Sequence, residues 1–487
     1  MLPRIARVLW KIIKWTVLVT VALFALAVLI NLRDEPLSDE ARALLETKPV
    51  NVPDNENIFV AMAGFNAPEG EDIFEFGRKR IEEIEKELAK DPSGFRMILR
   101  GEKEKNEGEL RWKKTEPPFD CLSGKETDLL ECAHLQKERL EKTLAANETL
   151  VRRYRLSREL PHYTAPQNPH AWFFLGSFSG SLTQGALKAQ ALLDIESGNA
   201  EEGWAFFKKD MVFWRQILKG KNYLIDTMAA TGRMTSEVYR LSLLLSSPTV
   251  DVEKYAMEWR ELLMPLSPEQ AHMRPALEGE IRSIYSLSQA YKKWTSFQEA
   301  AELKQEYRYC WLWEFGKCSS WRWWLEQNGQ NLFFQPNATF NYAVPFHKTW
   351  LKLTNLSRKD YMEQRDDSFA SLSELSEPGI RWVYNPYGKW MASRNSLIDY
   401  GFVETLHDLD AYLRLVRLQL ELRLAKIPSE EIPAFIEQLD EAYCSPCSDF
   451  SWDAETRMLS FQPYHEKSFT RHASASVYVP EVGVEKR

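Results

Sequence analysis

The 487-residue sequence lacks the signatures of the common hydrolase and nucleotide-binding sites. There is no G-x-S-x-G elbow, because Phe178 stands at the nucleophile position of 176–180. There is no P-loop, because no Gly-Lys pair follows a glycine by five positions. H-E-x-x-H is missing, and the eight histidines have no metal-ligand spacing. The sequence therefore predicts no catalytic motif of these classes, no metal site and no cofactor.

Basic residues are outnumbered, which argues against some partners. The chain has 62 Lys and Arg against 70 Asp and Glu. Four of the basic residues and none of the acidic ones precede position 33, so the rest carries 58 basic against 70 acidic. An acidic body is repelled by phosphate backbones. We therefore expect no nucleic-acid partner.

Charge is absent from one stretch near the N-terminus, residues 15–32. These eighteen residues are close to the length that crosses ~30 Å of hydrocarbon as a helix. Four basic residues in 1–14 precede the stretch, and acidic residues follow Arg33. By the positive-inside rule, the N-terminus is cytoplasmic and the bulk of the chain lies across the membrane. We expect a single-pass protein of the bacterial inner membrane with a periplasmic body.

A cleaved signal peptide is the alternative for this stretch, since its basic start and apolar middle would fit one. Ala25 and Ala27 even have the spacing of a cleavage site. The apolar run continues through 28–30, however, which a cleaved peptide does not need. The sequence thus favours an uncleaved anchor in contact with the lipid bilayer.

Cysteines are few, and all six follow the anchor. An even number of cysteines in an oxidising compartment predicts disulfides. Because short loops are the easiest to close, we expect local pairs. These pairs are Cys121–Cys132, Cys310–Cys318 and Cys444–Cys447.

The periodicity predicts a mainly α-helical body with a small β element near the C-terminus. Apolar residues recur every three or four positions along segments separated by Gly or Pro, which is typical of an antiparallel helical bundle or array. One such helix is expected over 342–364 and another over 402–425. The alternating residues 450–461 predict a β-hairpin, and 474–479 a further strand.

These patterns divide the chain into seven parts. They are a cytoplasmic segment (1–14), the transmembrane helix (15–32), a tether (33–72), a helical periplasmic domain (73–295), a Trp-rich cap (296–340), a second helical part (341–443) and a β element with a tail (444–487).

The Trp-rich segment has two interpretations. It contains Trp311, Trp313, Trp321, Trp323 and Trp324. Such a cluster would suit a surface that binds glycan or lipid, but tryptophan is also an ordinary packing residue with one polar atom. The sequence favours a cap stapled by a disulfide and keeps a binding module as the alternative.

Cys444-Ser-Pro-Cys447 also has two interpretations. A C-x-x-C pair is redox-active when a helix N-terminus or a cation stabilises the thiolate. Here a helix precedes the pair and a hairpin follows it, unlike the strand–motif–helix order of thioredoxin-like proteins. Neighbouring Asp and Glu residues would raise a thiol pKa. A structural disulfide is therefore favoured over a thiol–disulfide enzyme.

Several short motifs carry a likeness to known sequences. They are NIFVAMAG at 57–64, RRY at 152–154, FWR at 213–215, NPYG at 385–388, HDLD at 407–410, RLV at 414–416 and WD at 452–453. In these the chain resembles an uncharacterised family of proteobacterial proteins with one N-terminal span and a helical exported body. The resemblance implies that architecture but no activity, so it assigns no functional residue. Where relatives tend towards N-P-Y-T-G-x-P, this chain has its Cys444 pair, a feature of its own.

Together these observations favour a non-catalytic role. The expected function is that of a membrane-anchored scaffold, or of a component that binds another envelope protein. The thiol–disulfide enzyme and the glycan- or lipid-binding module are the alternatives.

The first prediction concerns topology. A reporter fused after Lys48 should be active in the periplasm, because basic residues precede the apolar run and acidic residues follow it. Membranes should retain the full-length chain. A reporter active only in the cytoplasm would reverse this topology, and a mature N-terminus near Val28 would make the run a signal peptide.

Overall fold

The computed structural model describes most of the chain, with gaps. The described residues are 2–46, 50–90, 108–119, 121, 129–166, 180–247, 250–294, 332–377, 379–395, 400–439, 450–464 and 475–480. Within them the protein is mainly helical, with one apolar N-terminal helix and a small antiparallel sheet near the C-terminus. The predicted fold class is therefore confirmed.

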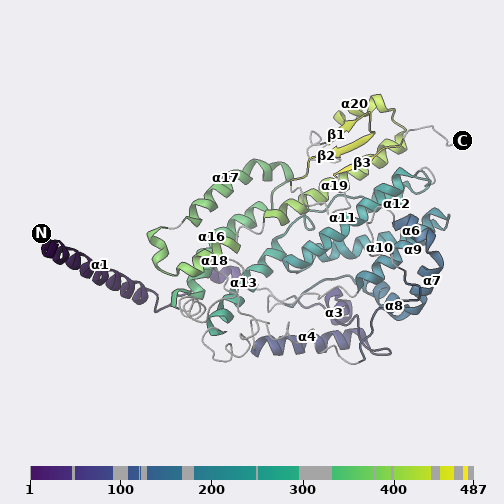
Figure 1. Cartoon of the computed structure of the whole chain (residues 1–487). Helices are drawn as coiled ribbons and strands as arrows, with labels where there is room; N and C mark the ends of the chain where they lie inside the picture. The colour runs from purple at the N-terminus through teal and green to yellow at the C-terminus, as the bar shows by residue number, and fades with distance from the viewer. Residues whose placement is uncertain are drawn as a thin grey trace.

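The N-terminal helix projects from one end of an elongated body, and the sheet lies at the other end (Figure 1). Helix α1 runs from Leu2 to Ile30 and includes the basic segment that precedes the apolar run. Its stretch Arg7–Ile30 is long and apolar enough to cross a membrane, and none of it is buried against the body. The apolar helix thus ends two residues before the expected boundary.

The first half of the body is built from helices joined by short connections. These are α4 (Ile73–Lys90), α6 (Leu129–Leu135), α7 (Lys137–Ala146), α8 (Glu148–Ser157), α9 (Gly180–Glu196), α10 (Ala200–Lys219), α11 (Leu224–Ser246), α12 (Ala256–Leu262) and α13 (Arg274–Trp294). Helix α10 packs on α9 and α11, and α11 also packs on α13 and α19. Such short connections between neighbouring helices are typical of antiparallel packing.

The second half adds longer helices and the sheet. Its elements are α16 (Pro336–Leu353), α17 (Arg358–Ser376), the 3-10 turn η3 (Ile380–Val383), α18 (Pro386–Asn395), α19 (Tyr400–Ala425), η4 (Ser429–Glu431), α20 (Ile432–Glu437), β1 (Phe450–Asp453), β2 (Met458–Phe461) and β3 (Ser476–Tyr478). One buried apolar cluster extends from Ile58 to Val479. The two expected helical parts therefore share a core.

The β element has the expected hairpin. Strand β2 pairs with β1 on one side and β3 on the other, both antiparallel. Leu459 is paired with Val477 and both are buried. Because side chains alternate along a strand, this register turns the apolar face of the sheet towards α19 and α11.

Residues 33–72 were expected to form a tether, but they contain short helices that pack on the body. These are α2 (Asp39–Leu45), the 3-10 turn η1 (Asp54–Glu56) and α3 (Ile58–Ala63). Helices α3 and α4 touch so closely that a Cβ on Gly77 would lie 2.1 Å from the carbonyl oxygen of Val60. A six-residue helix is too short to show a clear period, so the sequence pattern alone did not reveal it.

The expected helix over 342–364 is in fact parts of two helices. Helix α16 ends at Leu353 and α17 begins at Arg358. Between them Ser357 caps α17, its hydroxyl accepting a hydrogen bond of 3.1 Å from the Asp360 amide. A serine cap supplies an acceptor for an unpaired amide of the first turn, which favours a new helix start at this point.

Two histidines, one buried and one half-buried, make the fold sensitive to acid. Burial lowers the pKa of His347 to about 4, and the Nε2 atom of His347 has no hydrogen-bond partner. Burial, together with the charge of Arg358, lowers the pKa of His407 to about 4. Because unfolded histidines titrate near 6.5, the unfolded chain binds more protons between pH 6.5 and pH 4. Stability is therefore lost as the pH falls through this window.

We predict that His347→Gln reduces this loss. A non-titrating side chain should lower the slope of unfolding free energy against pH by up to ~1.4 kcal/mol per pH unit between pH 4 and 6.5. The measurement is denaturant unfolding of the full chain in detergent at several pH values. The same substitution at the exposed His162 controls for the general effect of a His-to-Gln change on stability. An unchanged slope in His347→Gln would contradict the prediction.

Candidate functional site

The best-defined polar site joins the end of the apolar helix to the body. Asn31 follows the last residue of α1, and only 1% of its surface is exposed. Its Nδ2 donates hydrogen bonds of 2.8 Å to the carbonyl oxygens of Ala27 and Val383. Its Oδ1 accepts a hydrogen bond of 2.7 Å from the backbone amide of Asn385. A single side chain therefore connects the end of α1 to the segment between η3 and α18.

A second layer of hydrogen bonds surrounds Asn31. The backbone amide of Gln335 donates a hydrogen bond of 2.8 Å to Oδ1 of Asn385, and Nδ2 of Asn385 donates one of 2.9 Å to the Thr339 hydroxyl. The Gln335 side chain donates to the Asn31 carbonyl. Asn385, Gln335 and Thr339 are all buried. Because unpaired buried polar groups are costly, this network favours one relative placement of α1 and α16.

The backbone around Asn385 suits only certain residues. Asn385 has a φ of 52°, in the left-handed region that Asn tolerates better than most residues. Gly388 packs so tightly that a Cβ would lie 1.9 Å from the Thr339 hydroxyl. The NPYG motif therefore supplies a turn and a close helix contact beneath the apolar helix.

The chain just after α1 adds contacts to the start of α16. The Asp34 carboxylate accepts hydrogen bonds from the amides of Asn337 and Ala338, over 2.8 and 3.0 Å. These amides belong to the first turn of α16, where a helix lacks internal partners and favours negative charge. Ser38 and Glu35 bond to Asn341. We call residues 31–38, 335–341 and 383–388 the anchor junction.

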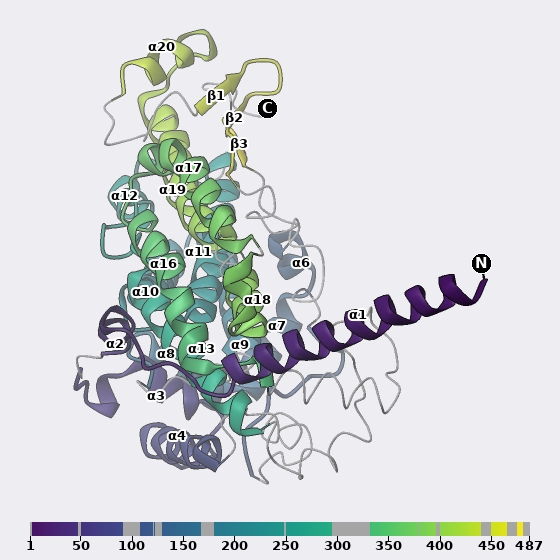
Figure 2. The ribbon, with the colours of Figure 1, turned by 90° about the vertical axis from the view of Figure 1, so that its left-hand side faces the viewer.

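Figure 2 shows the arrangement from the side of α1: the helix meets the body beside α13 and α18, then the chain continues to α2. Buried Ala41 of α2 packs with Ile281, Phe340 and Val344 from α13 and α16. The segment after α1 is thus held by hydrogen bonds at its start and by apolar packing further along.

A cluster of charges inside the body is the other conspicuous polar feature. Lys188 forms an ion pair with Glu237, and both are at least 97% buried. The Asp210 carboxylate accepts hydrogen bonds from Tyr154, Gln184 and Trp214, over 2.6, 2.7 and 3.2 Å. Burial lowers the pKa of Lys188 and raises that of Glu237. These side chains come from α8, α9, α10 and α11, so the cluster fixes how the four helices fit together.

A third polar cluster links α17, α19 and the residues that follow β2. Arg358 pairs with Asp408 at 3.0 Å and donates a hydrogen bond to the Gln462 carbonyl. The guanidinium carbon lies 3.8 Å from the ring centre of Tyr464, whose amide donates to Asp408. Arg358 and Asp408 are buried. The cluster joins the sheet end of the molecule to the helices.

Other motif residues have similar roles. Arg153 of RRY donates hydrogen bonds to four carbonyl groups of residues 65–71. Arg215 of FWR donates to the carbonyls of Met264 and Pro265. Asn57 caps α3 and donates to the Thr164 carbonyl, while Asp453 accepts two amides of the hairpin turn. Polar residues of the motifs therefore hold segments of the fold together.

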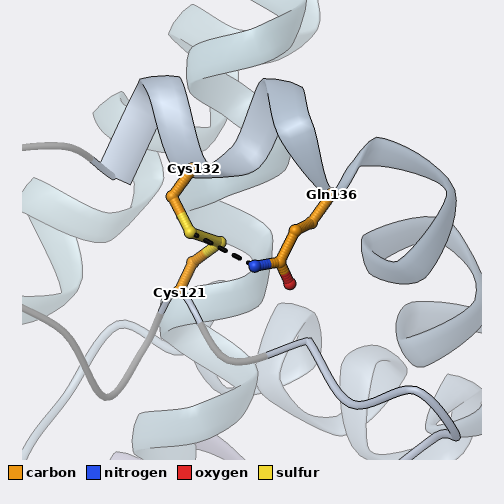
Figure 3. Close-up of a disulfide and its surroundings, with 3 residues drawn as sticks. All are labelled: Cys121, Cys132 and Gln136. Carbon is orange, nitrogen blue, oxygen red and sulfur yellow. Dashed lines mark hydrogen bonds between the residues drawn. A yellow bond between two sulfur atoms is a disulfide. The ribbon is translucent and has the colours of Figure 1, made fainter.

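One predicted disulfide is present. Cys121 and Cys132, with Cα atoms 5.7 Å apart, are bonded to each other, and Gln136 donates a hydrogen bond to the Cys132 sulfur (Figure 3). The bond fastens the segment before α6 to that helix. Cys310, Cys318, Cys444 and Cys447 lie outside the described residues, as do Trp311, Trp313, Trp321, Trp323 and Trp324.

The described residues contain no group of three or more His, Cys, Asp or Glu side chains placed to hold a metal ion. Comparison with protein-family models, curated proteins and solved structures finds no match to this chain. Sequence reasoning did not identify the anchor junction, although an asparagine at the end of the apolar run and the NPYG motif were its signals.

We predict that Asn385→Ala destabilises the junction. The substitution removes the acceptor of the Gln335 backbone amide and the donor to the Thr339 hydroxyl, and it puts alanine at positive φ. The expected loss of unfolding free energy is ~2–4 kcal/mol. Trypsin should also cleave after Arg33 faster than in the wild type. The measurements are denaturant unfolding in detergent and timed proteolysis.

Asn385→Gly is the matched control, because glycine accepts the backbone conformation but makes no side-chain hydrogen bonds. It should lose less unfolding free energy than Asn385→Ala, and the difference between the two variants measures the cost of placing alanine at a positive φ. Wild-type stability and cleavage rate in both variants would show that the network contributes nothing.

Proposed function

We propose that the chain is a non-catalytic scaffold of the bacterial envelope, anchored in the inner membrane by α1, whose periplasmic body binds another envelope protein. The observation that carries this proposal is the anchor junction. A loose linker would let an enzyme domain diffuse around its anchor, whereas buried hydrogen bonds to Asn31 hold this body at one orientation. A fixed orientation suits a protein that presents a surface at a set place above the membrane.

Two features support the periplasmic placement. The basic residues before the apolar stretch and the acidic ones after it agree with a cytoplasmic N-terminus. The bond between Cys121 and Cys132 fits an oxidising compartment, because disulfides are rare in the cytosol. Both features concern different parts of the chain, so they support the placement independently.

The non-catalytic role is supported by how the buried charges are used. Catalytic acids and bases need access to a substrate, often with a shifted pKa. Lys188 and Glu237 do have shifted pKa values, but they pair with each other inside the core. Asp210 already accepts three hydrogen bonds from protein side chains. These groups are better explained as the polar part of a helix interface.

The experiment combines partner capture with an activity assay. Crosslinking in intact cells with a reagent confined to the periplasm, followed by purification of the full chain, should yield the same crosslinked protein from the wild type and from Cys444→Ser with Cys447→Ser. Purified protein should show no insulin reduction and no thiol oxidation. The double substitution should lower the unfolding free energy by only ~1–3 kcal/mol, because a disulfide between residues 444 and 447 would close a short loop and such a disulfide contributes little.

A further variant, Asn385→Ala, should give less of the crosslinked protein, because it loosens the orientation of the body. Thiol turnover that disappears in the folded double cysteine variant would establish the enzyme instead. Absence of any crosslinked protein in the wild type would reject the scaffold.

A further inference from the structure

The anchor junction lies directly at the end of the apolar stretch of α1. The apolar stretch ends at Ile30, and Asn31 bonds directly to Val383 and Asn385. These residues must therefore lie at the height where α1 leaves the hydrocarbon layer. No flexible linker separates the body from the membrane surface at this end.

One contact lies deeper. The ring of Phe333, just before α16, meets the ring of Phe24 edge-on, with centroids 6.4 Å apart. Phe24 precedes Ile30 by six positions, so it lies ~9 Å further along the helix at 1.5 Å per residue. Phe24 therefore lies ~9 Å below the point where α1 leaves the hydrocarbon layer, and Phe333 beside it reaches the outer acyl chains.

The neighbouring side chains have the chemistry of a lipid interface. Val383 is 43% exposed although its carbonyl is bonded to Asn31. Arg381 is exposed beside it, and half-buried Trp382 lies between the two. Aromatic rings prefer the headgroup level, and long basic side chains extend their charge to phosphate while their stems stay in apolar surroundings.

The two acidic residues that follow Arg33 accept hydrogen bonds from the body. Asp34 is bonded to the backbone amides of α16 and Glu35 to the side chain of Asn341, and Arg33 is exposed beside them. Lys389 donates to the Arg381 carbonyl and lies 5.7 Å from the ring centre of Tyr384. Positive and aromatic groups thus remain near the membrane although the whole chain is acidic.

We propose that residues Phe333 and 381–383, together with Arg33, form a membrane seat, a surface of the body that places the Phe333 ring in the outer acyl chains and the other residues among the lipid headgroups around α1. This inference rests on the proposed anchoring of α1. It adds a second contact with lipid, made by the folded body, which would fix the tilt of the body as well as its position. The partner is the lipid of the bilayer that α1 crosses.

The test uses the full chain in phospholipid nanodiscs, with the photoreactive amino acid benzoylphenylalanine at single positions. Val383 is the test position. Tyr478 in β3 is the control, because its 42% exposure matches that of Val383 but it lies at the sheet end of the body. Mass spectrometry of the labelled peptides counts lipid adducts. We expect about tenfold or more lipid adducts at 383 than at 478, because only the seat lies within reach of the ~40–45 Å bilayer.

A second label at Arg381 guards against local distortion at 383 and should give the same excess. Equal adduct levels at 383, 381 and 478 would overturn the seat, as would adducts to protein alone. Carbonate extraction of the same labelled chains separates the two proposals. Chains that resist extraction but form no lipid adducts retain the anchor and lose only the seat, whereas chains released by carbonate would refute the anchor itself.

Discussion

The placement of the whole body depends on one side chain at the end of the apolar helix. Asn31 uses its donor for the Val383 carbonyl and its acceptor for the Asn385 amide, and it is almost fully buried. Leaving either group unpaired would cost more than the bond contributes in water, because both lie away from solvent. The junction therefore behaves as a unit, and Asp34 extends it into the first turn of α16.

The same principle recurs through the body. Arg153, Asp210 and Arg358 are buried polar residues on helices, and each bonds to segments far away in sequence. Apolar packing alone tolerates small shifts between helices, whereas a buried charge with fixed partners penalises them. The paired charges therefore specify the helix arrangement more than they add to its stability, since desolvation offsets much of their attraction.

Sequence patterns predicted the long elements well and the junction poorly. Helix α19 and the hairpin of β1 and β2 lie where the apolar spacings over 402–425 and 450–461 predicted them. Helices α2 and α3 are too short for a period, and 33–72 was therefore interpreted as a tether. The junction joins residues more than 300 positions apart, and no local pattern reports such contacts. Asn31 and the NPYG motif could be seen in the sequence, but the hydrogen bonds between them could not be predicted from it.

Amide hydrogen exchange at Asn385 tests the fixed attachment most directly, because that amide is bonded only across the junction, to the side chain of Asn31. The measurement needs the full chain in nanodiscs, with the amides of buried helix α11 as an internal reference. If the body is fixed on α1, the Asn385 backbone amide should exchange slowly, by the same large-scale opening that exposes α11. Exchange at the rate of an unprotected peptide, with α11 still protected, would show that the body moves freely on α1 and would contradict this account.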